Sequence, residues 1–317
     1  MTQHITTAGI DTSKSKLDAA VHGRSERWQV ENGPAGWRRL AKSFARAGVQ
    51  RVGIESTGGY ERGVVRFLRD KGFTVLLLQP FRVRAYAHLK LRRAKNDALD
   101  AVLIAACTTL IEGPDIEPDE RLADLAGRLT YIDQLDSDIA RWKARLEHAQ
   151  DGHVRRSIER DIKRLEKRRE GELKSLIEAL RRHPDLAHRL DLVQSVAGIG
   201  ERTALAIVVR MPELGRVSRE EVTALAGLAP YDDDSGTHQG KRHIAGGRGR
   251  LRRSLYNAAL AASFRWNTAL IDLYHRLIAR GKTHKQALIA CARKLLIYAN
   301  TVVARGTPWE IRNKASA

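Results

Sequence analysis

Two short apolar segments near the N-terminus each end in an acidic residue, and this pattern constrains the fold more than any other. Ala8-Gly9-Ile10 is followed by Asp11, and Val52-Gly53-Ile54 is followed by Glu55. Short apolar runs bounded by polar turn residues are typical of strands inside a sheet. Residues 73–79 (FTVLLLQ) are almost wholly apolar, as in a strand covered on both faces. The sequence therefore predicts a sheet with carboxylates at its strand ends.

The other elements of this N-terminal segment complete a mixed α/β arrangement. Residues 4–11 and 17–21 favour a hairpin, and residues 28–30 favour a third strand. Helices are expected over residues 34–47 and from the turn at residues 57–59 to Lys71, with Gly48 and Gly72 as their C-terminal caps. This order indicates a mixed sheet with helices on both sides.

A second pair of acids lies on the helix expected after the last strand. Asp97 and Asp100 are three positions apart, so one helical face presents both carboxylates. Magnesium prefers such hard oxygen ligands, and two ions can clamp the attacking and leaving oxygens of a phosphodiester. Asp11, Glu55, Asp97 and Asp100 together match the arrangement by which ribonuclease-H-like nucleases hold magnesium, although each acid alone is more often a turn, cap or solvated residue. We therefore predict a Mg²⁺ site at these four residues.

Composition favours a polyanionic partner. The 317 residues carry a formal charge of +19, and the pI is about 10.3. A hydrophobic content of 43% supports real cores and excludes a disordered basic tail. Binding to DNA or RNA is thus expected, with marked salt dependence. A merely basic, ribosome-like protein is the plainer alternative.

Several residues that could carry chemistry are expected to be structural. Cys107 and Cys291 lie far apart in apolar helical contexts, which favours buried thiols in a reducing compartment. Asp18 and Glu61 are read as structural acids. The chain shows no signal-peptide pattern and no apolar run near the roughly 20 residues that span a bilayer, so a cytoplasmic location is expected.

Changes in composition divide the chain into three segments: residues 1–116, 117–188 and 189–317. The middle segment carries a thin apolar stripe among many charges, which predicts a helical coiled coil, and its partner is expected from a second copy. Residues 150–153 are compatible with a turn between two helices or a stutter in one. A solvated helical spacer is the alternative. The last segment is expected to be mostly helical, with long helices over residues 251–279 and 285–304.

Two sequence features other than the acidic residues are candidates for binding nucleic acid. Basic side chains follow the last strand of the first segment, where they can run along a phosphate backbone: Arg82, Arg84, Lys90, Arg92, Arg93 and Lys95. Gly198 and Gly200 flank an apolar residue between two helices, as in a helix-hairpin-helix that binds phosphate through backbone N–H groups. A plain helix–helix turn remains the alternative.

A glycine-rich basic loop over residues 230–250 contains Ser235 followed by glycine. A serine that attacks a phosphodiester needs an exposed hydroxyl and nearby cations. The loop and the helix after it supply candidates: Lys241, Arg242, Arg248, Arg252 and Arg253. From the residues alone, a Ser-Gly in a polar loop is nearly always a turn.

These motifs, in this order, resemble the insertion-sequence-110 type transposases, known as bridge RNA-guided recombinases. The resemblance covers essentially the whole chain. It is carried by Gly9-Ile10-Asp11, Glu55-Ser56-Thr57-Gly58, Lys95-Asn96-Asp97-Ala98-Leu99-Asp100, Gly198-Ile199-Gly200 and the block from Gly227-Leu228-Ala229-Pro230 through Ser235 to Arg253.

The resemblance implies more than the residues do by themselves. It implies a RuvC-like domain with a D-E-D-D tetrad at Asp11, Glu55, Asp97 and Asp100, a coiled coil, and a transposase domain whose catalytic serine is Ser235. It further implies a 5′-phosphoserine link to DNA at a site shared between protomers, in a tetramer of two dimers. A structured non-coding RNA would pair with target and donor DNA. Ser254 is the second choice for the nucleophile.

Three other functions stay open at this point. A RuvC-like junction endonuclease would hydrolyse DNA with water and form no covalent adduct. A site-specific invertase of the same ancestry would work without a guide RNA. A nucleic-acid-binding protein with vestigial acids would be indifferent to Asp11→Asn.

Overall fold

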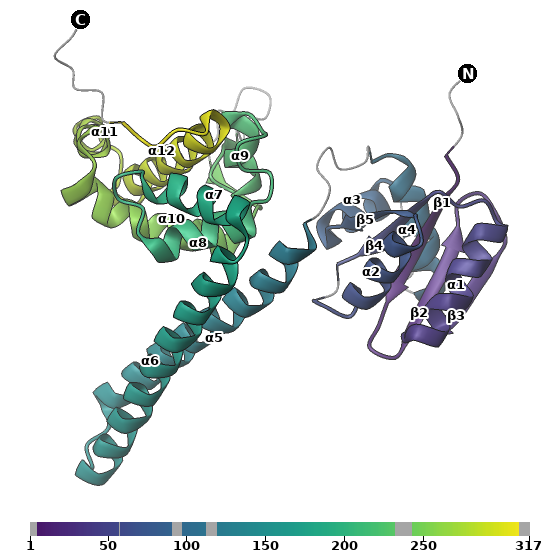
Figure 1. Cartoon of the computed structure of the whole chain (residues 1–317), viewed down its shortest axis with the longest axis horizontal. Helices are drawn as coiled ribbons and strands as arrows, with labels where there is room; N and C mark the ends of the chain where they lie inside the picture. The colour runs from purple at the N-terminus through teal and green to yellow at the C-terminus, as the bar shows by residue number, and fades with distance from the viewer. Residues whose placement is uncertain (1–4, 57, 91–96, 112–118, 232–242, 311–317) are drawn as a thin grey trace, which may run out of the picture. The chain divides into compact units, whose positions relative to one another are not determined.

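The computed structural model describes residues 5–56, 58–90, 97–111, 119–231 and 243–310; of residues 97–99 it describes the backbone only. The chain divides into two compact units, Met1–Glu117 and Pro118–Ala317 (Figure 1). Each unit has its own hydrophobic core.

The first unit is built on a five-stranded mixed sheet. Its strands are β1 (Thr7–Thr12), β2 (Lys16–Val21), β3 (Arg27–Glu31), β4 (Arg51–Glu55) and β5 (Thr74–Leu78), in the spatial order β3-β2-β1-β4-β5. The first three strands pair antiparallel, whereas β4 pairs parallel with both β1 and β5. This confirms the mixed sheet predicted from the sequence.

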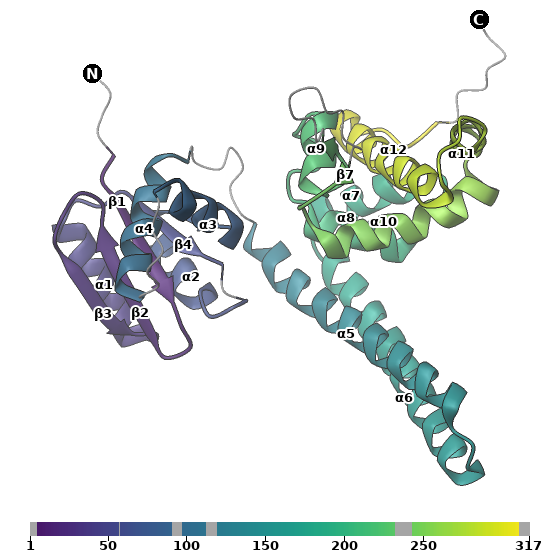
Figure 2. The same cartoon turned by 180° about the vertical axis from the view of Figure 1, so that it is seen from behind.

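Helices cover both faces of the sheet (Figures 1 and 2). On one face α1 (Pro34–Arg46) and α2 (Arg62–Asp70) bury apolar side chains such as Leu40, Phe44 and Leu68 against strand residues such as Ile10 and Ile54. On the other, α3 (Pro80–Leu89) and α4 (Asp97–Thr109) pack on the sheet through a smaller cluster that includes Leu78, Val83 and Ile104. Alternation along each strand separates the two sets of side chains.

Two glycines let α4 lie directly on the sheet. Gly9 and Gly53 are partners in the parallel register between β1 and β4. A Cβ atom on Gly9 would lie 2.2 Å from the backbone nitrogen of Ala105, and one on Gly53 would lie 1.9 Å from Oγ1 of Thr108. No side chain fits at either position, so the helix backbone approaches the strands closely.

The second unit starts with a helical hairpin. Helices α5 (Glu120–His148) and α6 (Gly152–Arg181) are separate, and each is capped at its N-terminus by an aspartate, Asp119 or Asp151. Lys143 of α5 pairs with Glu166 of α6 at 2.8 Å, and Arg128 donates to Ser175 at 2.9 Å, so the two helices run antiparallel. Of the two readings of residues 150–153, the structure shows the turn.

The partner that the thin stripe of α5 requires comes from the same chain. The sequence predicts a partner from a second copy; here α6 lies along α5 instead. Near the base of the hairpin, Leu125 and Leu129 of α5 and Leu176 of α6 share one core with residues beyond 189. The predicted second and third segments thus share one compact unit, Pro118–Ala317, because the hairpin base is buried in the core of the last segment.

The rest of the second unit is mostly helical. It contains α7 (Pro184–Gln194), α8 (Glu201–Arg210), α9 (Arg219–Leu225), a two-stranded ribbon of β6 (Pro230–Tyr231) and β7 (His243–Ile244), α10 (Gly249–Ala261), a π-helical turn η1 (Ala262–Trp266), α11 (Thr268–Ala279) and α12 (His284–Arg305).

The prediction of one helix over residues 251–279 is wrong. The chain passes through η1 and then adopts an extended conformation at Asn267, where φ is −128°. The Asn267 side chain accepts a hydrogen bond from the Leu270 backbone N–H and donates one to the Ala197 carbonyl, at 3.2 and 3.0 Å. Capping and a tertiary contact therefore stabilise the break.

Helix α12 is the one helix in the described part of the chain that is long and apolar enough to cross a membrane. Among its apolar residues, Leu288, Leu295 and Leu296 are fully buried in the core of the second unit. This is the burial expected of the central helix of a globular core.

Candidate functional site

The first two predicted acids lie on the sheet face that α4 covers. Asp11 follows Gly9 by two positions on β1, and Glu55 follows Gly53 by two positions on β4, so each shares a face with its glycine. Because β1 and β4 are parallel and Gly9 pairs with Gly53, both carboxylates lie at the C-terminal ends of their strands, on the same side of the sheet.

Helix α4 runs antiparallel to β1, which places its first turn at that end of the sheet. Thr7, near the start of β1, donates from Oγ1 to the Ala105 carbonyl at 3.3 Å. Further along the strand, the position of a Cβ on Gly9 lies 2.3 Å from the Ala101 carbonyl oxygen. Moving from Thr7 towards Asp11 therefore means moving back along α4 towards Asp100. The predicted acids of β1, β4 and α4 thus belong to one region of the first unit.

The chemistry of these groups suits a hard cation. Asp11, Glu55 and Asp100 are half-buried and supply only carboxylate oxygens. Asp11 accepts a hydrogen bond from the Thr12 N–H at 2.9 Å, and all three acids have further polar or electrostatic interactions. Among described residues, no three His, Cys, Asp or Glu side chains form a group that could hold a metal ion. The side chain of Asp97, the fourth acid, lies outside the description, so the magnesium site stays a prediction.

Asp18 and Glu61 have partners within the fold. Asp18 stands opposite Asp11 in the β1–β2 pairing, accepts from Nε2 of Gln29 at 2.8 Å, and lies 3.2 Å from Nζ of Lys16. Glu61 accepts from the Gly59 N–H at 2.9 Å and is buried. Both contacts fit the structural role expected for these acids.

The basic residues after β5 are only partly described. Arg82, Arg84 and Lys90 are exposed on or next to α3. Arg84 donates to the Pro80 carbonyl at 3.3 Å, and Nζ of Lys90 lies 5.7 Å from the ring centre of Tyr86. The other predicted contacts of this stretch lie outside the described residues: Arg92, Arg93 and Lys95.

The two glycines of the predicted hairpin have different tasks. Gly198 has φ of 96°, and a Cβ there would lie 2.3 Å from Cβ of Ala262, so packing alone requires glycine. Gly200 is the N-cap of α8, and nothing lies within 4 Å of the Cβ it lacks. Open space at the start of α8 is compatible with phosphate binding, and the packing role of Gly198 is sufficient for a plain turn.

Ser235, Lys241 and Arg242 lie outside the described residues. The structure describes the residues that precede and follow this segment. Tyr231 of β6 pairs with His243 of β7 in antiparallel register, and Pro230 pairs with Ile244. The described residues on either side of this segment therefore form a short antiparallel ribbon.

Of the three predicted arginines after this segment, two have intramolecular partners. Arg248 makes a two-pronged ion pair with Glu213, at 2.8 and 2.6 Å. Arg252 donates to the carbonyls of Gly227 and Gly246, at 3.2 and 2.7 Å, and so holds the loop to α10. Arg253 is exposed, and lines a cavity between α5, α8 and α10.

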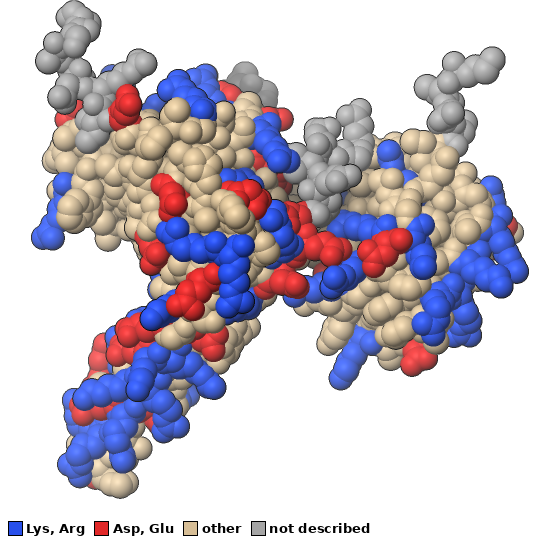
Figure 3. Space-filling model, in the orientation of Figure 1, with Lys and Arg blue, Asp and Glu red and all other residues tan. Residues whose placement is uncertain are grey.

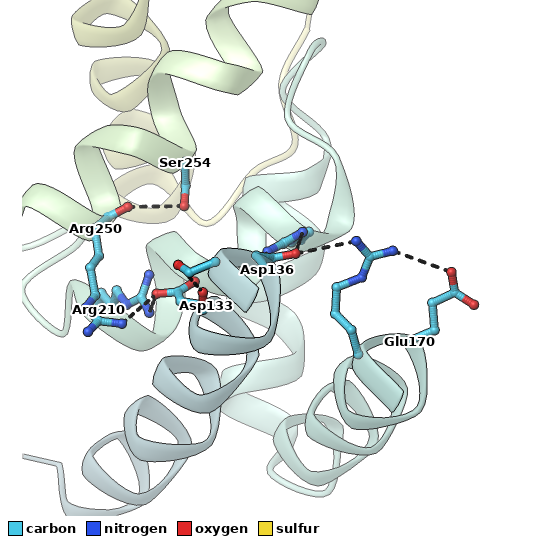
Figure 4. Close-up of polar contacts among 9 residues, drawn as sticks. Asp133, Asp136, Glu170, Arg210, Arg250 and Ser254 are labelled. Atoms are coloured by element: carbon cyan, nitrogen blue, oxygen red, sulfur yellow. Dashed lines mark hydrogen bonds and ion pairs between the residues drawn. The ribbon is translucent and has the colours of Figure 1, made fainter. Parts of the chain in front are cut away.

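That cavity has a volume of about 730 Å³ and mixes acids with arginines. Asp133 accepts from Arg210 at 2.6 Å and from Arg250 at 3.2 Å (Figure 4). Burial lowers the pKa of Arg210, and its ion pair with Asp133 counteracts this. Asp136 pairs in the same way with Arg202. The acids of α5 thus neutralise arginines that would otherwise be available to a polyanion.

Ser254, the second candidate nucleophile, also lines this cavity. Its Oγ donates to the Arg250 carbonyl one turn earlier, at 3.3 Å (Figure 4). Such a bond is usual for a serine inside a helix and occupies the hydroxyl proton.

Sequence reasoning missed a basic stripe on α6. Spacings of three and four along the helix put five exposed cations on one face: Arg156, Arg160, Lys163, Arg164 and Lys167. Figure 3 shows Lys and Arg side chains crowded on the far half of the α5–α6 hairpin. The helical spacing of these cations is the signal in the sequence that indicates the stripe.

Comparison with known protein families gives two matches on this chain. Residues 8–154 match a transposase family of the DEDD, IS110 type, and residues 190–276 match the transposase IS116/IS110/IS902 family. The first match covers the sheet from the second residue of β1 onward and includes the four acids, and the second covers α8, the β6–β7 ribbon and α10.

Similar proteins agree with these matches. The pilin gene-inverting protein of Moraxella bovis is 26% identical over 315 residues, which cover 96% of this chain and 97% of that protein. Its counterpart from Moraxella lacunata is 25% identical over the same shares. An uncharacterized 43.6 kDa protein of insertion element IS110 from Streptomyces coelicolor is 33% identical over 132 residues, or 41% of this chain and 32% of that protein. The chain belongs to the IS110 family of transposases.

Proposed function

We propose that this transposase is a magnesium-dependent, RNA-guided site-specific DNA recombinase that cuts and rejoins strands through a phosphoserine intermediate. The observation that carries the proposal is the seating of α4 on Gly9 and Gly53. That seating directs the start of α4 to the end of the sheet where Glu55 closes β4 and Asp11 is the penultimate residue of β1.

In this proposal Asp11, Glu55, Asp97 and Asp100 hold Mg²⁺ and orient the scissile phosphate. The bound cation would supply charge stabilisation for the pentacoordinate phosphorus. The acids come from two strands and one helix of a rigid layer, which suits a site that must keep several carboxylates converging on one place. The half-buried state of Asp11 and Glu55 supports this role, because they remain accessible to a substrate.

Ser235 would be the nucleophile. Its Oγ forms a bond to the scissile phosphorus, the bond from phosphorus to the 3′ oxygen breaks, and the hydroxyl proton leaves with the new 3′-OH. The 5′ phosphate stays on the protein as a phosphodiester. Because one ester replaces another, a 3′-OH of the partner strand can reverse the step without ATP.

Two further parts of the proposal rest on the family resemblance. The serine and the tetrad would come from different protomers, in a tetramer of two dimers. A non-coding RNA would pair with donor and target DNA and so select the sites. The basic stripe of α6 and the exposed Arg82 and Arg253 supply cationic surface for such partners.

A covalent trap tests the nucleophile. Full-length protein is incubated with Mg²⁺ and labelled donor DNA, together with the RNA of its element, and adducts are resolved under denaturing conditions. We expect an adduct with wild type and with Ser254→Ala, and none with Ser235→Ala. An adduct of equal yield from Ser235→Ala would remove this serine from the mechanism. Strand cleavage that depends on Asp11 without any adduct would identify the hydrolytic nuclease instead.

Copurification tests the guide. The protein is isolated from cells that carry the complete element, and bound RNA is sequenced. One discrete species from the flank of the gene is the expected result. A heterogeneous RNA population that is exchangeable with unrelated RNA would leave only general polyanion binding.

DNA inversion without a guide RNA is the second candidate. It is favoured by the near full-length likeness to proteins named as pilin gene-inverting. Recombination between inverted sites by protein freed of RNA would support this second function. It would also show that recombination by this protein does not always require a guide RNA.

A further inference from the structure

A second cavity, of about 450 Å³, lies beside the β6–β7 ribbon. The ribbon and the loop before it contribute Leu228, Pro230, His243 and Ile244. The other wall comes from the end of α11 and the first turns of α12, including Leu277, Lys282, Thr283, Lys285, Gln286, Ile289 and Arg293. The volume is within the range of ordinary small-ligand pockets.

The charge of this cavity has one sign. Lys282, Lys285 and Arg293 line it, and none of its described lining residues is acidic. The cavity between α5, α8 and α10 differs, because Asp133 and Asp136 neutralise its arginines. Three cations without a carboxylate in the same described lining attract an anionic ligand.

The other part of the lining is apolar. Leu228 is buried, and Leu277 and Ile289 are half-buried, while the imidazole of His243 is exposed on the ribbon. A flat heterocycle can pack on such a floor and stack on an imidazole. Lys285, Ile289 and Arg293 follow one another at intervals of four along α12, so cations and an apolar side chain share one face of the lining. This mixture matches the charged and the apolar part of a nucleotide.

We propose that this cavity binds one unpaired nucleotide of DNA. Its phosphate would contact Lys282, Lys285 and Arg293, and its base would lie on Leu228, Leu277 and Ile289. Such a nucleotide exists during recombination, since strands must separate before they are exchanged. The idea that it adjoins the cleaved bond rests on the proposed function: β6 and β7 bracket the segment of sequence that contains Ser235, and Tyr231 precedes that serine by four residues.

Binding to single-stranded DNA, measured without Mg²⁺ so that no chemistry occurs, tests the cavity by itself. The full chain is titrated into a fluorescent single-stranded oligonucleotide and, separately, into the matching duplex. The double variant K282E/K285E should bind the single strand at least tenfold more weakly and the duplex within about threefold of wild type. Both lysines are exposed, so folding is not at stake. The loss of contacts to this one phosphate should also reduce the slope of log affinity against log salt by about 0.7.

Lys294→Glu is the matched control. Lys294 is exposed on the same helix, places its ammonium over the Tyr298 ring at 5.3 Å, and does not line the cavity. Its affinity for the single strand should stay within about twofold of wild type, after the same charge change that each lysine of K282E/K285E undergoes. Equal losses from Lys294→Glu and K282E/K285E would overturn the proposal, because general electrostatics would then explain both. Unchanged single-strand binding by K282E/K285E would overturn it as well.

Ile289→Trp tests the base-binding floor. A larger side chain there should weaken single-strand binding without changing the salt slope, while the far-ultraviolet spectrum stays native. An unchanged affinity would overturn the placement of the base. If K282E/K285E loses single-strand binding while Ser235→Ala still forms the adduct, the nucleotide site is supported and the serine mechanism is contradicted. If K282E/K285E binds normally while Ser235→Ala forms no adduct, the serine mechanism is supported and the nucleotide site is contradicted.

Discussion

Gly9 of β1 and Gly53 of β4 are register partners, and α4 lies directly on both. The seat has two different contacts. At Gly9 the helix presents its own backbone, at Ala101 and Ala105, whereas at Gly53 it presents the side chain of Thr108. Replacing either glycine by alanine adds the same methyl group, but the two substitutions should differ in whether a second change can rescue them.

Gly53→Ala should destabilise the protein by about 1–3 kcal/mol, because the new methyl group meets Oγ1 of Thr108. Thr108→Ala in the same chain removes that oxygen and should restore most of the loss. Urea unfolding followed by circular dichroism measures both variants. An equal stability for Gly53→Ala and the double variant would contradict the contact.

Gly9→Ala should cost at least as much, and no side-chain trimming should rescue it. Its Cβ would lie 2.2 Å from a backbone nitrogen and 2.3 Å from a carbonyl oxygen, so α4 itself must shift. Because that shift moves the start of α4, DNA cleavage should fall further than stability does. Wild-type cleavage by a stably folded Gly9→Ala protein would show that the seat of α4 does not position the acids.

Asp11→Asn should lower Mg²⁺-dependent cleavage by more than about 100-fold, beyond the 10- to 100-fold usual for residues that only support a metal ligand. DNA affinity should be retained. Asp18→Asn is the matched control, since Asp18 faces Asp11 across the strands but is engaged by Gln29 and Lys16. Single-turnover cleavage and a binding titration separate the two effects. Equal losses from both variants would place Asp18 in the site.

Asp133→Ala should destabilise the second unit by about 2 kcal/mol, less than the 3–5 kcal/mol of a fully buried pair. The substitution leaves Arg210, whose side chain is 10% exposed, without its 2.6 Å partner. Arg210→Met in the Asp133→Ala background should recover most of the loss. Arg250→Ala, at a half-exposed partner of the same carboxylate, should cost under about 1 kcal/mol by the same denaturant titration.

The ion triad of Asp119, Arg121 and Asp185 should make the free energy of unfolding depend on pH in the acidic range. Hydrogen bonds from Arg121 lower the pKa of both carboxyls below its ordinary value. The unfolded chain therefore binds protons more readily, so this stabilisation is complete above about pH 5 and is lost as the pH falls through the folded values. Arg121 and Asp185 are exposed and Asp119 is half-buried, so solvent screening limits the contribution to under about 1 kcal/mol.

Arg121→Gln tests this linkage. The variant should be slightly less stable than wild type at pH 7 and equally stable near pH 2.5. Unfolding free energies at both pH values decide the matter, and a difference that does not change with pH would contradict the assignment.

Both cysteines should be unreactive in the folded protein. Cys107 and Cys291 are buried, and burial raises the pKa of each thiol. Labelling with a chromogenic disulfide reagent should therefore be slow at pH 7.5 and become rapid only within the urea transition. Immediate reaction of one thiol per chain in native buffer would show that one of these packing sites opens.

Much of the first unit was predictable because its signals are local. The apolar runs before Asp11 and Glu55, and the strand over residues 74–78, have the length and bounding residues of buried strands. The order of strands and helices then indicated the mixed sheet. The cysteines were placed correctly by their apolar neighbours.

Other features had no local signal. Nothing near Gly9 or Gly53 in the sequence indicates that a helix 50 to 100 residues away lies on them. The break at Asn267 depends on the Ala197 carbonyl, which is 70 positions distant, and the apolar pattern of residues 251–279 continues through it. Likewise, Arg248 and Arg252 look like free cations until Glu213 and the Gly246 carbonyl are brought to them.

The amino-acid sequence by itself determined the periodic elements, the order of the acids and the membership of a transposase family, because propensity, periodicity and motif spacing act over a few residues. The tertiary structure decided which glycines carry α4, which arginines are already neutralised, and which cations line a cavity without an acid among its described residues. Those properties are distances between parts of the chain that are remote in sequence, and packing against a common core sets them.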